Sequence, residues 1–272
     1  MMLRSVLNHR QMPATLLALL VLALGACATP PSDPAARAEF DETNDPLEPL
    51  NRKTFAFNQF FDRIIFRPVA VTYEAAVPET ARDAIHHFLD NLGEPVVFAN
   101  NLLQGEFKRA DHTAGRFLMN SIFGVGGLMD LATKEGLEKQ TGDFGQTLYY
   151  WGVPEGPYLV LPILGPSNPR DGIGLGVDSY ADPYGLAFSG STFTNANYGR
   201  YVINGVDQRQ RNIQTLDELQ RNAIDFYSQL RSLFRQHRAS ELRHGEPAPL
   251  PELDSLYQDP ASKPQMSQAK PR

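Results

Sequence analysis

The chain has little cysteine and no surplus of basic charge. Its 272 residues include one cysteine, Cys27, so no disulfide can form within the chain and paired-cysteine metal motifs are excluded. The formal net charge is −6, which excludes a general nucleic-acid binder because such a protein needs a basic face for phosphates. The same balance argues against simple electrostatic adhesion to an anionic membrane. Any membrane contact must therefore come from apolar surface or a covalent anchor.

Sequence motifs of common enzyme classes are also missing. No GxSxG nucleophile elbow, HExxH pair or GxxxxGK[ST] phosphate loop occurs. Gly172, Gly174 and Gly176 form a loose glycine run, but the run is not GxGxxG and no strand is expected before it. The sequence therefore predicts no cofactor, and it shifts weight toward binding or transport.

The histidines give only weak candidate sites. His86 and His87 are adjacent, so on a helix their side chains point about 100° apart and make a poor joint metal site. Asp111 and His112 could begin a hydrolytic site only if a nucleophile approached in space, and Ser121 is the nearest candidate. We predict no metal site and no catalytic residues.

The N-terminus has the pattern of a secretory signal. Arg4 and Arg10 flank the start of an apolar run over residues 14–24, which is about half the roughly 20 residues needed to span a bilayer. The run ends in Leu-Gly-Ala-Cys at residues 24–27, which resembles the bacterial lipobox. In that motif cleavage falls before the cysteine and a diacylglycerol is attached to its sulfur. Several acyl chains, at roughly 0.8 kcal/mol per buried CH₂, would give lasting attachment.

These features divide the chain into four parts. Residues 1–26 are the expected signal peptide, and residues 27–44 are a lipidated, flexible tether rich in proline and alanine. Residues 45–243 are the expected folded body, and residues 244–272 are an expected disordered tail. Ala28 follows the cysteine, where lipoproteins retained in the inner membrane often carry Asp, so the resemblance favours the outer membrane.

Apolar residues at helical spacing dominate the body. A stripe over residues 47–64 predicts a first helix, ended by Pro68, with more aromatic area than a soluble surface helix needs. A second helix is expected from Pro78 to Leu92 with Gly93 as its stop, and a third from Pro95 to near Gly105.

The later part of the body mixes irregular and helical segments. Residues 141–166 are interrupted by prolines, with a short extended piece expected over 158–164. Residues 197–242 are expected to be helical again, with Thr215 and Glu218 as a capping box.

Residues 116–132 predict two apolar helical arms joined by a glycine-rich bend. Gly124, Gly126 and Gly127 lie at its centre, and the run is too short and too broken to span a membrane as one helix. Two interpretations remain open at this point. The segment is either a hairpin in an apolar core or a mobile apolar hairpin that faces lipid.

The chain resembles the MlaA/VacJ family of outer-membrane lipoproteins over roughly residues 44–240. Each matching motif is weak alone, but their order behind a lipobox is specific. The motifs are NDPLE at 44–48, NR at 51–52, RPVAV at 67–71, NLGEP at 91–95, LQG at 103–105, NSIFGVGGLMD at 120–130, FGQTL at 144–148, WGV at 151–153, GPY at 156–158 and LP at 161–162. Residues 154–155 and the tail after Arg243 depart from the pattern.

The resemblance implies a mainly α fold. It would be a single ring-like helical domain with a central channel, embedded in one leaflet on the periplasmic side of the outer membrane. It also implies removal of mislocalised phospholipids from the outer leaflet, through an amphipathic channel, to a periplasmic lipid-carrier protein. Porin trimers of the outer membrane would be further partners, and the direction of transport comes from the resemblance alone.

Two groups of residues are the expected membrane and channel elements of this fold. We predict a membrane-facing aromatic helix with Phe57, Phe60 and Phe61. The predicted channel and hairpin residues are Asn120, Phe123, Gly124, Gly126, Gly127 and Met129. Two alternatives remain, a structural or adhesive surface lipoprotein without transport, and a secreted lipid hydrolase that uses Ser121 and His112.

Overall fold

The computed structural model describes residues 45–184 and 191–246, and for residues 191–197 it describes the backbone only. Four predictions fall wholly or mainly outside these ranges. They are the signal peptide of residues 1–26, the lipid attachment at Cys27, the tether of residues 27–44, and the tail of residues 244–272 apart from its first three residues.

The described part is built almost entirely of helices. In chain order the elements are α3 (Glu48–Phe61), the π-helix η1 (Asp62–Phe66), α4 (Arg67–Ala76), α5 (Glu79–Leu103), α6 (Phe107–Ile122), α7 (Leu131–Lys134), α8 (Phe144–Tyr150), β1 (Leu159–Leu161), β2 (Gly165–Ser167), α9 (Pro169–Tyr180), α11 (Ser191–Arg211), α12 (Ile213–Asn222) and α13 (Phe226–Leu242). None of the helices in the described ranges is both long enough and apolar enough to cross a membrane.

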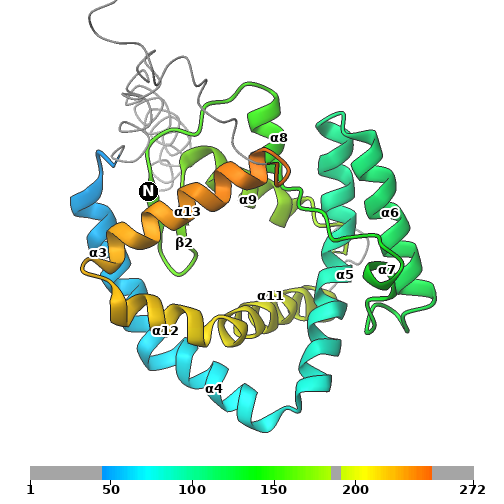
Figure 1. The fold of residues 1–272 in the computed structure, drawn as a ribbon, viewed down its shortest axis with the longest axis horizontal. Helices are drawn as coiled ribbons and strands as arrows, with labels where there is room; N and C mark the ends of the chain where they lie inside the picture. Colours follow the sequence, from blue (N-terminus) through cyan, green and yellow to red (C-terminus); the bar gives the residue numbers. More distant parts are fainter. Residues whose placement is uncertain (1–44, 185–190, 247–272) are drawn as a thin grey trace, which may run out of the picture.

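The helices are arranged as a ring (Figure 1). In that view α3, α4 and α5 follow the left, lower and right sides, and α13, α9 and α8 close the upper side. Helix α11 contacts α4, α5 and α12, while α6 packs against α5 outside the ring. The predicted mainly α, ring-like fold is confirmed.

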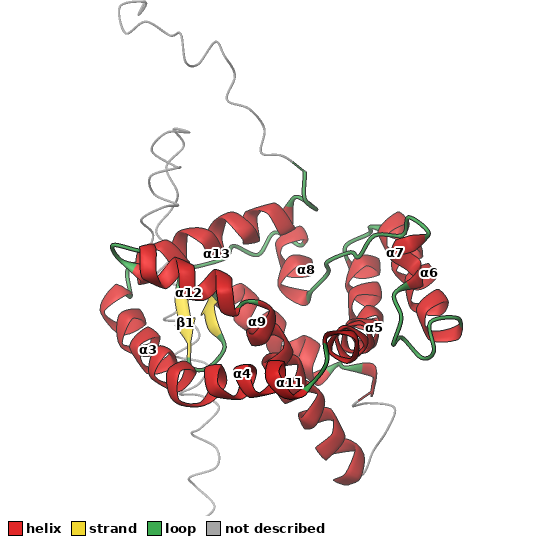
Figure 2. Cartoon of the chain, turned by 60° about the horizontal axis from the view of Figure 1, so that its bottom comes forward, coloured by secondary structure: helices red, strands yellow, loops and turns green. Residues whose placement is uncertain are grey.

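A two-stranded hairpin stands within the ring, between α3 and α9 in Figure 2. Its strands pair antiparallel with Val160 opposite Pro166. The extended piece predicted over residues 158–164 is confirmed for its first half, and β2 was not predicted. Strand β1 contacts α3 and β2 contacts α13, so the hairpin joins the two ends of the described chain.

The predicted helix end at Pro68 is wrong. The backbone continues from α3 through η1 into α4, and the Arg67 amide bonds to the carbonyl of Asp62, five residues earlier. A proline ring inside an α-helix meets the carbonyl of the preceding turn. The wider π-turn directly before Pro68 relieves that contact, so the helix continues with a bulge.

The predicted break at Gly93 and Pro95 is also wrong, because α5 is one helix of 25 residues that contains both. Its polar side chains Asn91, Glu94 and Asn101 are buried against neighbouring elements. Tertiary contacts of this kind override the weak helix propensity of glycine and proline. The predicted beginning at Pro78 and the end near Gly105, where φ is +78°, are confirmed.

Three further expectations about helices need correction. Thr215 does not begin a capping box, because α12 begins at Ile213 and the chain breaks again before α13. Asp225 caps α13 by accepting bonds from the amides of Tyr227 and Ser228. The segments that became α8 and α9 were predicted to be irregular or left unassigned, and Gly174 of α9 lies directly against Gly145 of α8.

Polar and apolar side chains are distributed in the reverse of the usual order. The fully buried side chains of largest volume are polar or charged, among them Arg116, Gln146, Asn51 and Asn101. The buried apolar set consists of three alanines, Tyr158, Val160 and Tyr227. Large apolar side chains are exposed on α3, η1, the 122–129 turn and α11 instead. A contiguous exposed apolar surface marks contact with a partner or a membrane.

Candidate functional site: a cavity in the ring and an apolar hairpin

A cavity of about 560 Å³ lies between α3, η1, the β-hairpin turn, α11, α12 and α13. Its apolar wall includes Phe55, Phe66, Leu164, Val206, Phe226 and Leu230. Its polar wall includes Asn58, Gln59, Asp62, Arg209 and Gln220. One cavity therefore offers both an apolar and a charged surface, as an amphipathic ligand requires.

Two asparagines of α3 position the hairpin that forms one wall. Asn51 donates to the carbonyl of Tyr158 at 2.9 Å and accepts from the amide of Val160 at 2.9 Å. Asn58 does the same with the carbonyl of Leu161 and the amide of Ile163, at 2.9 and 2.7 Å. They are seven residues apart and so share one helix face, which satisfies the strand edge as a neighbouring strand would.

Ion pairs fix the charged wall. Arg209 of α11 donates to both carboxylate oxygens of Asp62, at 2.6 and 2.9 Å, and its side chain is 11% exposed. Arg67 pairs with Asp217 of α12 at 2.7 Å. The hydrogen bond and charge of Arg67 hold the pKa of Asp217 below its usual range. The Arg209–Asp62 pair ties α11 to η1, and the Arg67–Asp217 pair ties α12 to α4.

The base of α13 is anchored to α3 by aromatic and charged contacts. Phe55 packs against Phe226 and Tyr227, with ring centroids 5.6 and 5.5 Å apart. Arg52 donates to both carboxylate oxygens of Asp225, and these hydrogen bonds hold the pKa of Asp225 well below its ordinary value. The cavity wall is thus closed between the first and last helices of the described chain.

The glycine-rich bend after α6 is a tight turn with exposed tip residues. Val125, Gly126 and Gly127 have positive φ angles of 56°, 70° and 96°. A Cβ on Gly124 would lie 2.3 Å from the carbonyl oxygen of Met129, so this position has no space for a side chain. Only four residues after the bend form helix α7, so the second apolar helical arm was predicted wrongly.

The tip and the root of the hairpin differ sharply in polarity. Phe123 is 70% exposed and Met129 is 47% exposed. Asn120 was predicted to line a channel, but its side chain is buried and donates to Asp130 while accepting from the amides of Leu131 and Ala132. The tip therefore lies outside any apolar core, which removes the core-hairpin interpretation for these residues.

A buried charge network lies behind the hairpin. Arg116 is 2% exposed, bonds to Glu94 at 3.0 Å, and lies 3.3 Å from Asp130. It also donates to Thr133 and to the carbonyl of Leu137. Burial raises the pKa of Glu94, against the opposing hydrogen bond and charge of Arg116. An unpaired charge at this buried position would destabilise the fold. Arg116 therefore has to keep its partners on α5, α7 and the neighbouring loops in place, and this fixes the path of the chain from α5 to α7.

Asp130 is held as a carboxylate within this network. Burial alone would raise its pKa, but hydrogen bonds from Thr133 and Asn120 and the charge of Arg116 outweigh that effect. The pKa of Asp130 is lowered to about 2 as a result. Its side chain also caps α7 by accepting from the amide of Thr133.

The predicted aromatic face of α3 is partly exposed. Phe57 is 44% and Phe60 is 57% exposed, while Phe61 is intermediate and contacts both rings at centroid distances of 4.6 and 5.9 Å. Ile64 and Ile65 of η1 continue this exposed apolar surface. That a membrane covers this surface is a prediction from the sequence.

The residues of the hydrolase alternative do not form a site. Ser121 accepts a hydrogen bond from Asn91, and His112 contacts Gln140 at 3.2 Å. Both residues are on α6, nine residues apart, which is about 13 Å along a helix axis. His86 lies 2.7 Å from Asp207 and 3.4 Å from Asp90, in an ordinary structural role.

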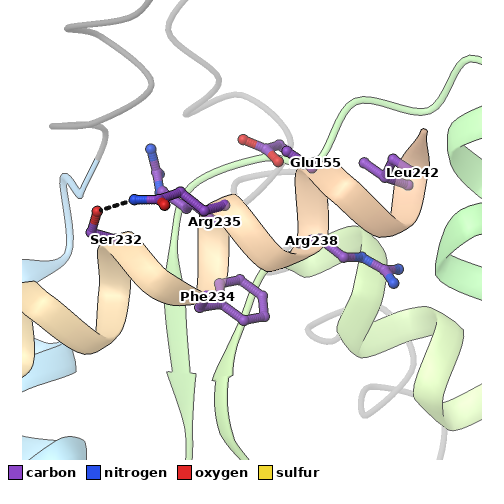
Figure 3. Close-up of a pocket in the computed structure, with 8 residues that line it drawn as sticks. Glu155, Ser232, Phe234, Arg235, Arg238 and Leu242 are labelled. Atoms are coloured by element: carbon purple, nitrogen blue, oxygen red, sulfur yellow. Dashed lines mark hydrogen bonds between the residues drawn. The ribbon is translucent and has the colours of Figure 1, made fainter. Parts of the chain in front are cut away.

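A second cavity, of about 410 Å³, runs along α13 (Figure 3). Phe234, Leu242 and the hydrogen-bonded pair Ser232 and Gln236 contribute to its lining. Arg238 also lines it and binds Asp143 and Asp171 at 2.6 and 2.8 Å. Arg238 is thereby committed to joining α13 to α8 and α9.

Sequence reasoning missed the polar residues that shape the main cavity and the hairpin root. Asn58, Asp62, Arg116 and Arg209 have no motif around them, and their partners are up to 147 residues away in the chain. Their only local signal was a polar side chain within an apolar helical stripe.

Comparison with known proteins gives consistent matches. The family model for the MlaA lipoprotein matches residues 43–241. Two similar proteins are named intermembrane phospholipid transport system lipoprotein MlaA. The Haemophilus influenzae protein is 34% identical over 213 residues, covering 76% of this chain and 83% of that protein. The Escherichia coli protein is 34% identical over 242 residues, covering 86% and 92%.

A solved structure, from work on the structural basis for maintenance of bacterial outer membrane lipid asymmetry, matches this fold with a TM-score of 0.64. Its sequence is 33% identical, and the match covers 73% of this chain and 98% of that chain. The similarity therefore extends over nearly the whole of that structure.

Proposed function

This chain belongs to the MlaA lipoprotein family, and from that premise we propose that it moves phospholipids out of the outer membrane. In this proposal it removes mislocalised phospholipids from the outer leaflet and passes them through the ring to a periplasmic carrier protein. The names of two relatives and the subject of the matching structure support the proposal.

The observation that carries the proposal is the amphipathic cavity within an apolar-surfaced ring. A phospholipid leaving a bilayer must take its charged head across an apolar layer, and burying an unpaired charge costs several kcal/mol or more. A cavity with Asp62 and Arg209 on one wall and Phe55 and Phe226 on another lowers that cost.

The exposed apolar surface supports embedding in one leaflet. Phe60, Ile64 and Phe123 are each at least half exposed, and the large buried side chains are polar. Covering such side chains with acyl chains removes apolar surface from water, which is favourable by about 25 cal/mol per Å² of that surface. The lipid on Cys27 would hold the ring to the periplasmic side of the outer membrane, and porin trimers would be its membrane neighbours.

The test is the phospholipid content of the outer leaflet in a strain that lacks the gene. We expect phospholipid to accumulate there, and we expect complementation by the wild type, but not by Cys27→Ala, to reverse it. An unchanged leaflet after deletion would contradict transport and favour the structural or adhesive alternative. Release of fatty acids by the purified protein, abolished by Ser121→Ala, would instead support the hydrolase.

A further inference from the structure

A third, polar cavity of about 340 Å³ adjoins the cavity of about 560 Å³ that is enclosed by the ring. It lies between η1, the start of α4 and α12, and shares Gln59, Asp62 and Gln220 with the larger cavity. Its remaining lining residues are Arg63, Arg67, Asp217 and Arg221. Figure 1 shows α12 alongside the continuous α3–α4 helix, and the Arg67–Asp217 pair joins them.

The charges around this cavity do not cancel. Asp62 is paired with Arg209, and Asp217 is paired with Arg67. Among the described residues, Arg63 and Arg221 form no hydrogen bond and no ion pair within 4 Å, although the charge of Arg221 contributes to lowering the pKa of Asp217. The guanidinium groups of Arg63 and Arg221 therefore line the same cavity, and neither forms an ion pair with a carboxylate of the described residues.

We propose that Arg63 and Arg221 bind the phosphate group of a phospholipid while its acyl part occupies the adjoining apolar cavity. Arginine presents several N–H donors in a planar fork that matches phosphate oxygens. The shared residues Gln59 and Gln220 lie where the headgroup would meet the chains. The proposal rests on the proposed function, since it names the part of the substrate that this part of the site recognises.

The apolar and polar cavities together favour a ligand that carries both acyl chains and an anionic group. A fatty acid would place its charge at the end of one chain, and a diacylglycerol would bring no charge to the arginines. A phosphodiester with attached acyl chains matches both cavities. Free phosphate shares the anionic chemistry, so the experiment must separate it from lipid phosphate.

The test uses the full chain purified in an uncharged detergent and three probes. The probes are dihexanoylphosphatidylglycerol, dihexanoylglycerol, which lacks the phosphate, and inorganic phosphate. Binding is measured by calorimetry for the wild type and for the double variant Arg63→Ala/Arg221→Ala. The control is Lys108→Ala/Lys134→Ala, which removes the same charge from two exposed lysines outside both cavities. Circular dichroism verifies the fold of each variant.

We expect the arginine double variant to bind the phospholipid about tenfold or more weakly, a change of about 1.4 kcal/mol. Its binding of dihexanoylglycerol should be unchanged, Arg63→Lys/Arg221→Lys should retain part of the affinity, and the lysine control should match the wild type. Equal phospholipid binding by the wild type and the arginine variant would overturn this inference but would leave the proposed function standing. Inorganic phosphate bound as tightly as phospholipid would also overturn it, because the site would then be a simple anion site.

Absence of phospholipid binding by the wild type would contradict the proposed function itself. If the arginine double variant fails to fold, the single variant Arg221→Ala is measured against Lys108→Ala. The expected result is then a smaller, phosphate-dependent loss, and no loss would overturn the inference.

Discussion

Asp130 is the carboxylate that closes the root of the glycine hairpin. It accepts hydrogen bonds from Asn120 and Thr133 and lies beside the buried Arg116. Removing its charge leaves Arg116 with Glu94 as its remaining carboxylate partner. The consequences can be tested through the pH dependence of stability, because the pKa of Asp130 is lowered to about 2 from 3.8.

Asp130→Asn should lower the free energy of unfolding by about 1–3 kcal/mol at pH 7, the range for hydrogen bonds to a charged group. The folded-state pKa lies below the unfolded value, so the stabilisation is present above about pH 4 and is lost as the pH falls toward 2. The difference between wild type and variant should therefore shrink between pH 4 and pH 2. Chemical denaturation in detergent measures it.

Asp111→Asn is the matched control, because Asp111 is an exposed carboxylate on α6. Its unfolding free energy should stay within about 0.5 kcal/mol of the wild type at every pH. A pH-independent difference for Asp130→Asn would show that the charge of Asp130 does not stabilise the hairpin root.

At the scale of elements, the hairpin glycines are not equivalent. A Cβ on Gly127 would lie 2.7 Å from the Cβ of Asn91, whereas a Cβ on Gly126 meets nothing within 4 Å. Gly126→Ala should therefore cost only about 1–2 kcal/mol of left-handed backbone strain, and Gly127→Ala should cost more. Thermal unfolding of the two variants gives the order, and equal losses would contradict it.

Gly126→Ala is the better probe of hairpin flexing, because it stiffens the turn without a clash. We expect the folded variant to show reduced transport in the outer-leaflet phospholipid assay. Undiminished transport by this variant, at wild-type abundance, would count against a role for hairpin movement.

The crossing of α8 and α9 depends on close approach of two glycines. A Cβ on Gly174 would lie 2.3 Å from the amide nitrogen of Gly145, and backbone cannot move aside cheaply. Gly174→Ala should destabilise the fold by about 1–3 kcal/mol or more. Gly176→Ala on the same helix has open space and should stabilise by about 0.5–1 kcal/mol. A neutral Gly174→Ala would contradict the packing at this crossing.

The sequence predicted helices well wherever an apolar stripe was regular, as for α3, α5 and the first arm of the hairpin. It failed where tertiary contacts decide, because Pro68 is relieved by a π-turn and Gly93 lies in a helix held by buried Asn91 and Glu94. The glycines of α9 were noted only as a loose glycine run and no helix was predicted there, because the contact of Gly174 with Gly145 is invisible in one sequence.

The site was predictable only in part. Four of the predicted residues are at least two-fifths exposed, as expected of apolar residues that contact a membrane: Phe57, Phe60, Phe123 and Met129. Asn120 was predicted as a channel or hairpin residue, and its buried side-chain oxygen accepts from the first two amides of α7. The cavity is formed by segments as far apart as Phe55 and Leu230, which no local pattern connects.

At the scale of the whole molecule, the ring inverts the usual order of a soluble protein. Its interior contacts include many hydrogen bonds and ion pairs, such as Arg209–Asp62 and Arg116–Glu94, and many of its large apolar side chains are exposed. We propose that lipid passes through the cavity enclosed by this ring.

Passage of lipid through the cavity can be tested at Gly205 without moving the side chains that form the cavity walls. It lines the cavity from α11, and a Cβ placed on it meets nothing within 4 Å. Gly205→Phe should therefore fill part of the 560 Å³ while the helix remains intact. Gly199 on the same helix also has open space but does not line this cavity, so Gly199→Phe is the matched control.

The most direct measurement is outer-leaflet phospholipid in the deletion strain complemented with each variant at equal abundance. We expect Gly199→Phe to restore the wild-type leaflet and Gly205→Phe to leave phospholipid accumulated there. Full restoration by a folded Gly205→Phe protein would contradict passage of lipid through the cavity.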